Sequence, residues 1–261
     1  MLGKPIAAGR TAEVYAWEEG KILKLYFEWF PLRGVEYEAQ MARAVCASGV
    51  PAPAAGEIVQ VNGRSGLVYQ RVDGETMSKT LQRRPWKLLA FARRMAEIHA
   101  QMHAQVAGEG IPSQRGRLVE KIQHAAALPE ETRQRVLTAL AALPDGNRLC
   151  HGDFHPENIL MAEQGEVIID WIDVTAGNPL ADVARTSILM LGAAETTGVK
   201  NRLLSRFITL LHNTYLHRYF ALRPGGEEEY ERWLPVVAAG RISENISEQE
   251  TWLIQQANLA G

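Results

Sequence analysis

The sequence predicts an α+β protein, with a small antiparallel sheet in residues 1–72 and a larger, mainly helical part over residues 73–261. Strand-like segments separated by turn residues fill the first part. Apolar residues spaced three and four positions apart dominate the second part. With 261 residues, 46% of them hydrophobic, the chain is large enough to bury a sizeable core.

Two hairpins and one helix are expected in the first part. The first hairpin lies in residues 14–27, where Glu-Glu-Gly joins two β-rich runs. A helix is expected over residues 35–48, ended by Gly49 and the proline-rich segment after it. The second hairpin lies in residues 57–72, with an Asn-Gly turn between alternating segments.

The second part is expected to consist mostly of helices. Its clearest apolar stripe lies within residues 86–106 and consists of Leu88, Phe91, Met95, Ile98 and Met102. Further helices are expected at about residues 130–143, 180–192, 201–220 and 247–259. The chain shows neither an internal repeat nor a low-complexity linker.

Composition narrows the function classes. The 28 basic and 30 acidic residues give a net charge of −2 without a basic stripe, so no nucleic-acid partner is expected. Only Cys46 and Cys150 are present, too few for a disulfide framework, which favours the cytoplasm. No window approaches 18 uninterrupted apolar residues and no cleavable leader is evident, so no membrane association is expected. The sequence indicates no particular oligomeric state.

Polar residues crowd into HGDFHPENIL, residues 151–160, directly before an apolar run. A short hairpin would connect this run to EVIID, residues 166–170, and bring Asp153, Asn158 and Asp170 to one end of a small sheet. Two carboxylates about 4 Å apart repel by roughly 4 kcal/mol at an effective dielectric constant near 20, so the cluster calls for a cation. Amide and carboxylate oxygens favour Mg²⁺, which completes its shell with water and substrate phosphates. A nucleoside triphosphate fits this chemistry.

Two other interpretations of the same stretch stay open. His151, Asp153 and His155 form H-x-D-x-H, which also suits a hydrolytic zinc or two-metal site. The stretch also suits a polar loop without chemistry, because Asp, Asn and Pro are common turn residues.

The pattern H-G-D-x-x-x-x-N followed by I-D resembles the catalytic segment of the aminoglycoside phosphotransferase family, small-molecule kinases with a protein-kinase-like two-lobe fold. The resemblance implies that Asp153 is the catalytic base and that Asn158 and Asp170 are magnesium ligands. It further implies that His151 fixes the loop and that Asp182 ties the loop down by hydrogen bonds.

The same resemblance assigns the nucleotide site in the first part. Lys24, on a predicted strand, would hold the α and β phosphates, with Glu38 on the next helix as its partner. Glu36 is the alternative partner, and an edge-strand lysine without chemistry is the alternative role for Lys24.

Residues 7–15 resemble the loop that covers the nucleotide. This loop has the single glycine Gly9 instead of G-x-G-x-x-G, so phosphate contacts would depend on backbone N–H groups and the Thr11 hydroxyl. The segment LVYQRVDG resembles the family's hinge and implies that the backbones of Gln70 and Val72 contact the adenine. His99, at the end of its helix, would pack beneath the catalytic loop.

The function implied is transfer of the γ-phosphoryl group of ATP, or of GTP in its place, to a hydroxyl of a small molecule, with Mg²⁺ as cofactor. Residues 223–250 hold seven glutamates against three arginines, which favours a cationic acceptor such as an aminoglycoside, choline or an amino alcohol, unless these acids form only a solvated helix face. The alternatives are a metal-dependent hydrolase using His151, Asp153 and His155, and a catalytically silent kinase-like binding module.

Overall fold

The computed structural model describes residues 2–260 and divides into two compact units. The first unit comprises the residues up to Thr80 together with 108–110 and 157–173. The second unit comprises Leu81–Ala107, Ile111–Pro156 and the residues from Val174 onward. The units therefore interleave along the chain, whereas the sequence analysis expects two contiguous parts.

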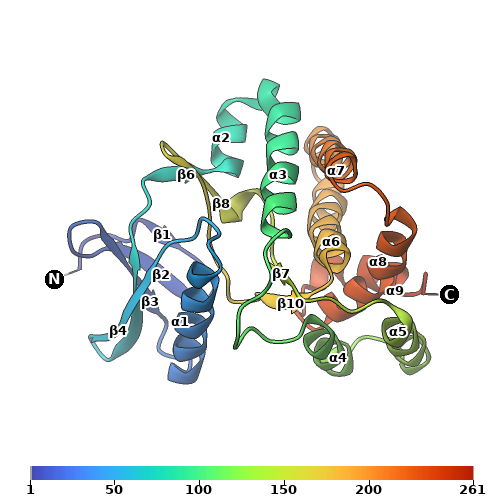
Figure 1. Ribbon diagram of the computed structural model, residues 1–261, viewed down its shortest axis with the longest axis horizontal. Coiled ribbons are helices and arrows are strands. Elements are labelled where there is room, and N and C mark those ends of the chain that lie inside the picture. Colours follow the sequence, from blue (N-terminus) through green and yellow to red (C-terminus); the bar gives the residue numbers. More distant parts are fainter. Residues whose placement is uncertain (1, 261) are drawn as a thin grey trace. The chain divides into compact units, whose positions relative to one another are not determined.

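The first unit contains a five-stranded antiparallel sheet with the strand order β1-β2-β3-β5-β4. Four of these strands, β1 to β4, are labelled in Figure 1. Its strands are β1 (Ala7–Ala8), β2 (Ala12–Ala16), β3 (Lys21–Tyr26), β4 (Ala55–Val61) and β5 (Arg64–Gln70). Both predicted hairpins are confirmed. In the turn of the second hairpin, Asn62 has φ 52° and Gly63 φ 81°, the left-handed conformation that an Asn-Gly turn adopts readily.

Helix α1 (Leu32–Ala47) begins three residues before its predicted start and ends one residue before its predicted end. Gly49, just beyond it, has φ 80°, a conformation that suits glycine after a helix. Val35 and Ala39 of α1 form a buried cluster with Tyr26 and Leu67 of the sheet. Burial of each large apolar side chain contributes roughly 1.5–3 kcal/mol, so this cluster stabilises the position of α1 on the sheet.

A second, three-stranded sheet of the first unit has the order β6-β8-β9. It consists of β6 (Gly74–Thr76), β8 (Ile159–Ala162) and β9 (Gly165–Ile168), and helix α2 (Met77–Arg83) follows β6. A Cβ atom on Gly74 would lie 2.7 Å from the carbonyl oxygen of Met161, so the close pairing of β6 with β8 requires glycine at this position. The predicted hairpin of residues 158–170 is confirmed by the β8–β9 pairing.

The second unit is mainly helical, as expected. Its helices are α3 (Leu88–Met102), α4 (Gln114–His124), α5 (Glu130–Ala142), α6 (Pro179–Gly198), α7 (Arg202–Leu222), α8 (Glu227–Ile242) and α9 (Glu250–Ala257). Single 3₁₀ turns precede α3 at Pro85–Lys87 and α9 at Ser247–Gln249. Strand β7 (Arg148–Cys150) pairs with β10 (Thr175–Gly177).

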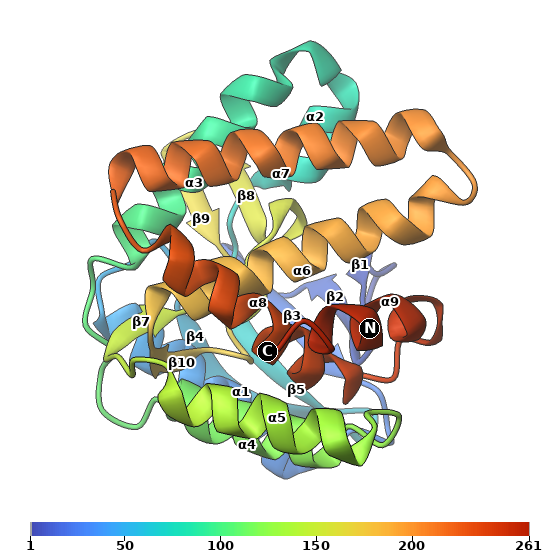
Figure 2. The ribbon, with the colours of Figure 1, turned by 90° about the vertical axis from the view of Figure 1, so that its right-hand side faces the viewer.

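The apolar stripe predicted for residues 86–106 is buried in α3 at all five positions. Helices α6, α7 and α8 pack together, and α4 and α5 lie side by side (Figure 2). Helix α6 extends six residues beyond its predicted end, and α2, α4 and α8 have no counterpart among the predicted helices. Within residues 2–260, no helix combines the length and the apolar character needed to cross a membrane.

Candidate active site

Lys24 lies on β3, which is an interior strand of the five-stranded sheet. Its Nζ donates to Oε1 of Glu38 at 2.7 Å and to Oδ1 of Asp170 at 3.4 Å. The predicted Lys24–Glu38 pair is therefore confirmed, and the alternative partner Glu36 is exposed. Because β3 has neighbours on both sides, the interpretation of Lys24 as an edge-strand lysine is wrong.

The ion pair is largely removed from solvent. The Glu38 side chain is 3% exposed and that of Lys24 is 20% exposed, and the Tyr69 hydroxyl donates a further hydrogen bond to Glu38 Oε1 at 3.0 Å. Burial alone would lower the pKa of Lys24, but the charges of Asp170 and Glu38 outweigh it and raise that pKa above its ordinary value. Lys24 is therefore a fixed cation between two carboxylates.

Asn158 and Asp170 flank the same end of the β8–β9 hairpin, because Ile159 pairs with Ile168. The Ile169 N–H donates to the Asn158 carbonyl at 3.0 Å and holds the two ends of the hairpin together. Asp170 has φ 64°, a left-handed conformation that aspartate tolerates better than most residues, and its side chain is 44% exposed.

This end of the hairpin suits a hard divalent cation. A carboxylate and a carboxamide provide the oxygen ligands that Mg²⁺ prefers, and the exposure of Asp170 leaves room for further ligands from water or phosphate. The residues present therefore fit the predicted magnesium site.

The predicted nucleotide loop is a tight connection between β1 and β2. Gly9 donates its N–H to the Ala12 carbonyl at 2.8 Å, and the Thr11 carbonyl accepts from the Phe27 N–H at 2.9 Å. Gly9 is exposed and Thr11 is half-buried. The turn is thus fixed by its own backbone, and the Thr11 carbonyl is already engaged.

The two predicted hinge residues differ in what their backbones can offer. The Gln70 N–H donates to the Ala54 carbonyl at 2.9 Å, so this group is engaged within the first unit. Val72 follows β5 and precedes β6, outside either strand.

In the second unit, the loop after β7 is anchored by Asp182 in the first turn of α6. Asp182 Oδ2 accepts from the His151 N–H at 2.7 Å, and its Oδ1 accepts from the Gly152 N–H at 2.8 Å. The predicted role of Asp182 in fastening this loop is confirmed. His151 is fully buried, and its Nδ1 accepts from the Asp153 N–H at 3.1 Å.

Asp182 is buried and charged because several donors surround it. Besides the two backbone N–H groups, Nε2 of His99 and Nε2 of His103 lie 3.1 and 3.2 Å from its Oδ2. Burial would raise the pKa of Asp182, but hydrogen bonds from His103 and His99 hold that pKa well below its usual range. The ring of His99 also stacks on that of Phe154, with centroids 4.1 Å apart, so His99 packs beneath the loop after β7 as predicted.

The two histidines are neutral. Burial is the main cause that lowers the pKa of His99 to about 3, and burial also lowers the pKa of His103. Their Nδ1 atoms lie 2.6 and 2.7 Å from the hydroxyls of Tyr215 and Tyr219. With Nε2–H donated to Asp182 and Nδ1 accepting from tyrosine, every polar atom of the two rings is satisfied.

Asp153 itself is 27% exposed. His155 Nε2 lies 3.3 Å from its Oδ2, and Arg185 Nη2 lies 4.0 Å from its Oδ1. Burial would raise the pKa of Asp153, but the hydrogen bond and charge of His155 and the charges of Arg185 and His151 lower it far below its ordinary value. Asp153 is therefore an ionised carboxylate that reaches solvent.

The hydrolytic metal site considered for His151, Asp153 and His155 gains no support from this geometry. Within residues 2–260, the trio whose ligand atoms converge is His99, His103 and Asp182, not the H-x-D-x-H residues. That trio is already satisfied by the hydrogen bonds described above.

Two side chains beside the loop after β7, His103 and Arg185, were not among the predicted site residues. His103 was not distinguished from other helical histidines, although it lies four positions after His99 and therefore on the same face of the helix. Arg185 lies three positions after Asp182, and that helical spacing was the signal that could have revealed it.

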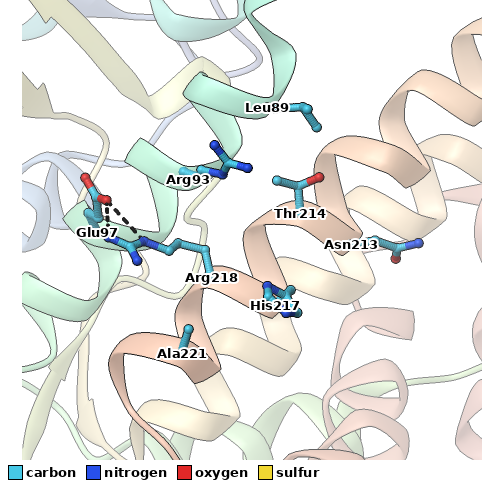
Figure 3. Close-up of a pocket in the computed structure, with 8 residues that line it drawn as sticks. All are labelled: Leu89, Arg93, Glu97, Asn213, Thr214, His217, Arg218 and Ala221. Carbon is cyan, nitrogen blue, oxygen red and sulfur yellow. Dashed lines mark hydrogen bonds and ion pairs between the residues drawn. The ribbon is translucent and has the colours of Figure 1, made fainter.

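A separate cavity of ≈ 670 Å³ lies between α3 and α7 (Figure 3). Two of the residues that line it form an ion pair between the helices, in which Arg218 Nη2 donates to Glu97 Oε1 at 2.7 Å. None of the predicted site residues lines it.

Comparisons with known proteins identify a family and a group of similar folds. A family model described as the phosphotransferase enzyme family matches residues 3–224. Comparison with proteins of curated function finds no match. Among solved structures, an aminoglycoside-3'-phosphotransferase of type VIII has a TM-score of 0.60 at 19% identity, covering 92% of this chain and 90% of its own.

Two other solved structures contain ligands. The aminoglycoside phosphotransferase APH(3'')-Id from Streptomyces rimosus, in complex with ADP and streptomycin, has a TM-score of 0.56 at 18% identity and covers 91% of each chain. The amicoumacin kinase hAmiN, in complex with AMP-PNP, Ca²⁺ and its ligand Ami, has a TM-score of 0.60 at 15% identity, covering 98% of this chain and 87% of its own. At these identities the likeness shows a shared kinase-like fold.

Proposed function

The chain belongs to the phosphotransferase enzyme family, and from this premise we propose that it transfers the γ-phosphoryl group of ATP to a hydroxyl of a small molecule. The observation that carries the proposal is the half-buried cation Lys24, held between Glu38 and Asp170. A lysine fixed in this way can donate hydrogen bonds to phosphate oxygens. The neighbouring carboxylates of Glu38 and Asp170 keep it charged.

Nucleotide binding is supported by the solved complexes of related folds, which contain ADP or AMP-PNP. In our proposal Lys24 binds the α and β phosphates, while the turn at Gly9 and Thr11 covers them. The hinge contributes backbone groups to the adenine, with Val72 better suited to donate than Gln70, whose N–H is already engaged. ATP is the proposed donor, and GTP is the alternative.

Asn158 and Asp170 are the proposed magnesium ligands. When bound, the ion supplies charge compensation for the phosphate oxygens. The chain's own contribution is to pair Asp170 with Lys24 and to hold both ligands at one end of the β8–β9 hairpin.

Asp153 is the proposed catalytic residue. As an ionised carboxylate that reaches solvent, it accepts a hydrogen bond from the acceptor hydroxyl and orients that oxygen toward the phosphorus atom. Its low pKa makes it a weak base, so proton transfer follows once the bond to phosphorus is well advanced.

The proposed acceptor is a small hydroxyl compound, and a protein of related fold is known in complex with the small molecule streptomycin. The acid excess in residues 223–250 supports a cationic acceptor of the aminoglycoside, choline or amino-alcohol type. Two of those acids are already engaged: Glu229 accepts from Asn178 Nδ2 at 2.7 Å, and Glu244 forms ion pairs with three cations. The panel of candidate acceptors should therefore include neutral and anionic compounds.

We assign the protein to the cytoplasm, where ATP is abundant and where Cys46 and Cys150, both free, remain reduced.

The test is phosphoryl transfer from γ-labelled ATP, with magnesium, to a panel of amino sugars, amino alcohols, sugars and hydroxy acids. We expect a labelled product above the ATP hydrolysis background with at least one acceptor, and no such product from the Asp153→Asn variant. Nucleotide binding without transfer to any acceptor would favour the silent binding module instead.

A further inference from the structure

A buried arginine one turn after Asp182 completes the anchoring of the catalytic loop. Arg185 Nε donates to the Gly152 carbonyl at 2.9 Å, while Asp182 Oδ1 accepts from the Gly152 N–H. Both polar groups of Gly152, whose φ is 78°, are thus bound by side chains of α6. The guanidinium of Arg185 therefore lies next to Asp153.

The strong ion pair of Arg185 is formed with a different carboxylate. Its Nη2 lies 2.6 Å from Glu244 Oε1 but 4.0 Å from Asp153 Oδ1. Glu244 follows α8 and also accepts from Arg241 Nη1 at 2.9 Å, with Lys121 Nζ at 3.5 Å. Three cations therefore surround the carboxylate of Glu244. The Arg185 guanidinium lies closer to this carboxylate than to that of Asp153.

Glu244 lies outside residues 3–224, the range matched by the family model. The C-terminal segment of this chain thus supplies the partner of an arginine that contacts the catalytic loop.

We propose that Glu244 is a positioning residue for phosphoryl transfer: it retains the Arg185 guanidinium and so keeps it from pairing more closely with Asp153, the proposed partner of the acceptor hydroxyl. This inference rests on the proposed function. A buried guanidinium is stabilised by a paired carboxylate, and if Glu244 is neutralised the Asp153 carboxylate, 4.0 Å from Arg185 Nη2, is within reach. A hydrogen-bonded ion pair, closer than the present contact of 4.0 Å, would then occupy the Asp153 oxygen that should orient the acceptor hydroxyl.

The decisive comparison uses Glu244→Gln, Arg185→Gln and the double variant. We expect Glu244→Gln to lower kcat by about tenfold or more, with KM for ATP within about twofold of the wild type, because only the orientation of the acceptor is disturbed. The double variant should then be faster than Glu244→Gln by about threefold or more, since the competing guanidinium is gone. A purely structural role predicts a double variant as slow as the worse single variant, or slower.

Glu131→Gln is the matched control, because Glu131 is an exposed glutamate of α5 outside residues 223–250 and outside the proposed machinery, and its loss should not change kcat. Unfolding temperatures of all variants separate loss of catalysis from loss of fold. An active wild type whose kcat is unchanged by Glu244→Gln, or a double variant without recovery, would overturn this inference alone. A wild type that transfers phosphoryl to no acceptor would refute the proposed function instead.

Discussion

At the scale of single residues, the charge of Asp153 carries the proposed chemistry. Asp153→Asn keeps the size of the side chain but removes the acceptor of the substrate's hydroxyl hydrogen. We expect kcat to fall by about 10²- to 10⁴-fold while the affinity for an ATP analogue, measured by calorimetry, changes by less than about twofold. Asp145→Asn, an exposed position before β7, is the control and should retain full turnover.

The buried histidines predict how stability depends on pH. The pKa of His99 is lowered to about 3 in the folded protein, against about 6.5 in the unfolded chain. Between these values the unfolded chain binds more protons, so stability decreases as the pH falls below about 6.5, by up to about 1.4 kcal/mol per pH unit for each such histidine.

Urea unfolding of the wild type at pH 7.5 and pH 5 measures this effect. We expect a lower free energy of unfolding at pH 5, and a smaller pH dependence in His99→Gln. His217→Gln removes an exposed histidine and should behave like the wild type. Equal free energies of unfolding at the two pH values would contradict the neutral state of His99 and His103.

At the scale of elements, strand β3 offers a matched pair of lysines. Lys24 lies between two carboxylates, whereas Lys21, on the same strand, is exposed and pairs with Glu18. We expect Lys24→Met to weaken nucleotide binding by about 10- to 100-fold, the range for losing a charge-assisted hydrogen bond, and Lys21→Met to have no effect. Similar affinities for the two variants would remove Lys24 from the nucleotide site.

Helix α6 depends on its N-cap. The Asn178 side chain accepts from the Leu180 N–H at 2.9 Å and donates to Glu229, and Asp182 lies in the same first turn. We expect Asn178→Ala to lower the free energy of unfolding by about 0.5–2 kcal/mol, measured by urea denaturation. A change within error would show that Pro179 and packing alone fix this end of the helix.

Elements with a regular pattern were predictable, and short or fully buried ones were not. The stripe of α3 and the Asn-Gly turn between β4 and β5 are local signals that tertiary packing preserves. Strands β7 and β10 have three residues each, too few for an alternating pattern. Helix α8 contains Pro235 and is buried on most of its surface, so no single apolar stripe marks it.

At the scale of the whole molecule, the sequence was sufficient for the fold class and for two of the contacts in the candidate site. The Lys24–Glu38 pair and the anchoring of the loop after β7 by Asp182 were implied by the resemblance to the aminoglycoside phosphotransferase family, and the structure contains both. The Arg185–Glu244 pair joins residues 59 positions apart and has no local pattern, so only the packing of α6 and α8 reveals it. The interleaving of the two units is likewise a property of tertiary contacts.

The most direct test of the account is a crystal structure with a non-hydrolysable ATP analogue and Mg²⁺. We predict that Lys24 Nζ lies within hydrogen-bond distance of the α or β phosphate and that oxygens of Asn158 and Asp170 coordinate the metal. A triphosphate bound away from Lys24, or a metal held by neither Asn158 nor Asp170, would contradict the account.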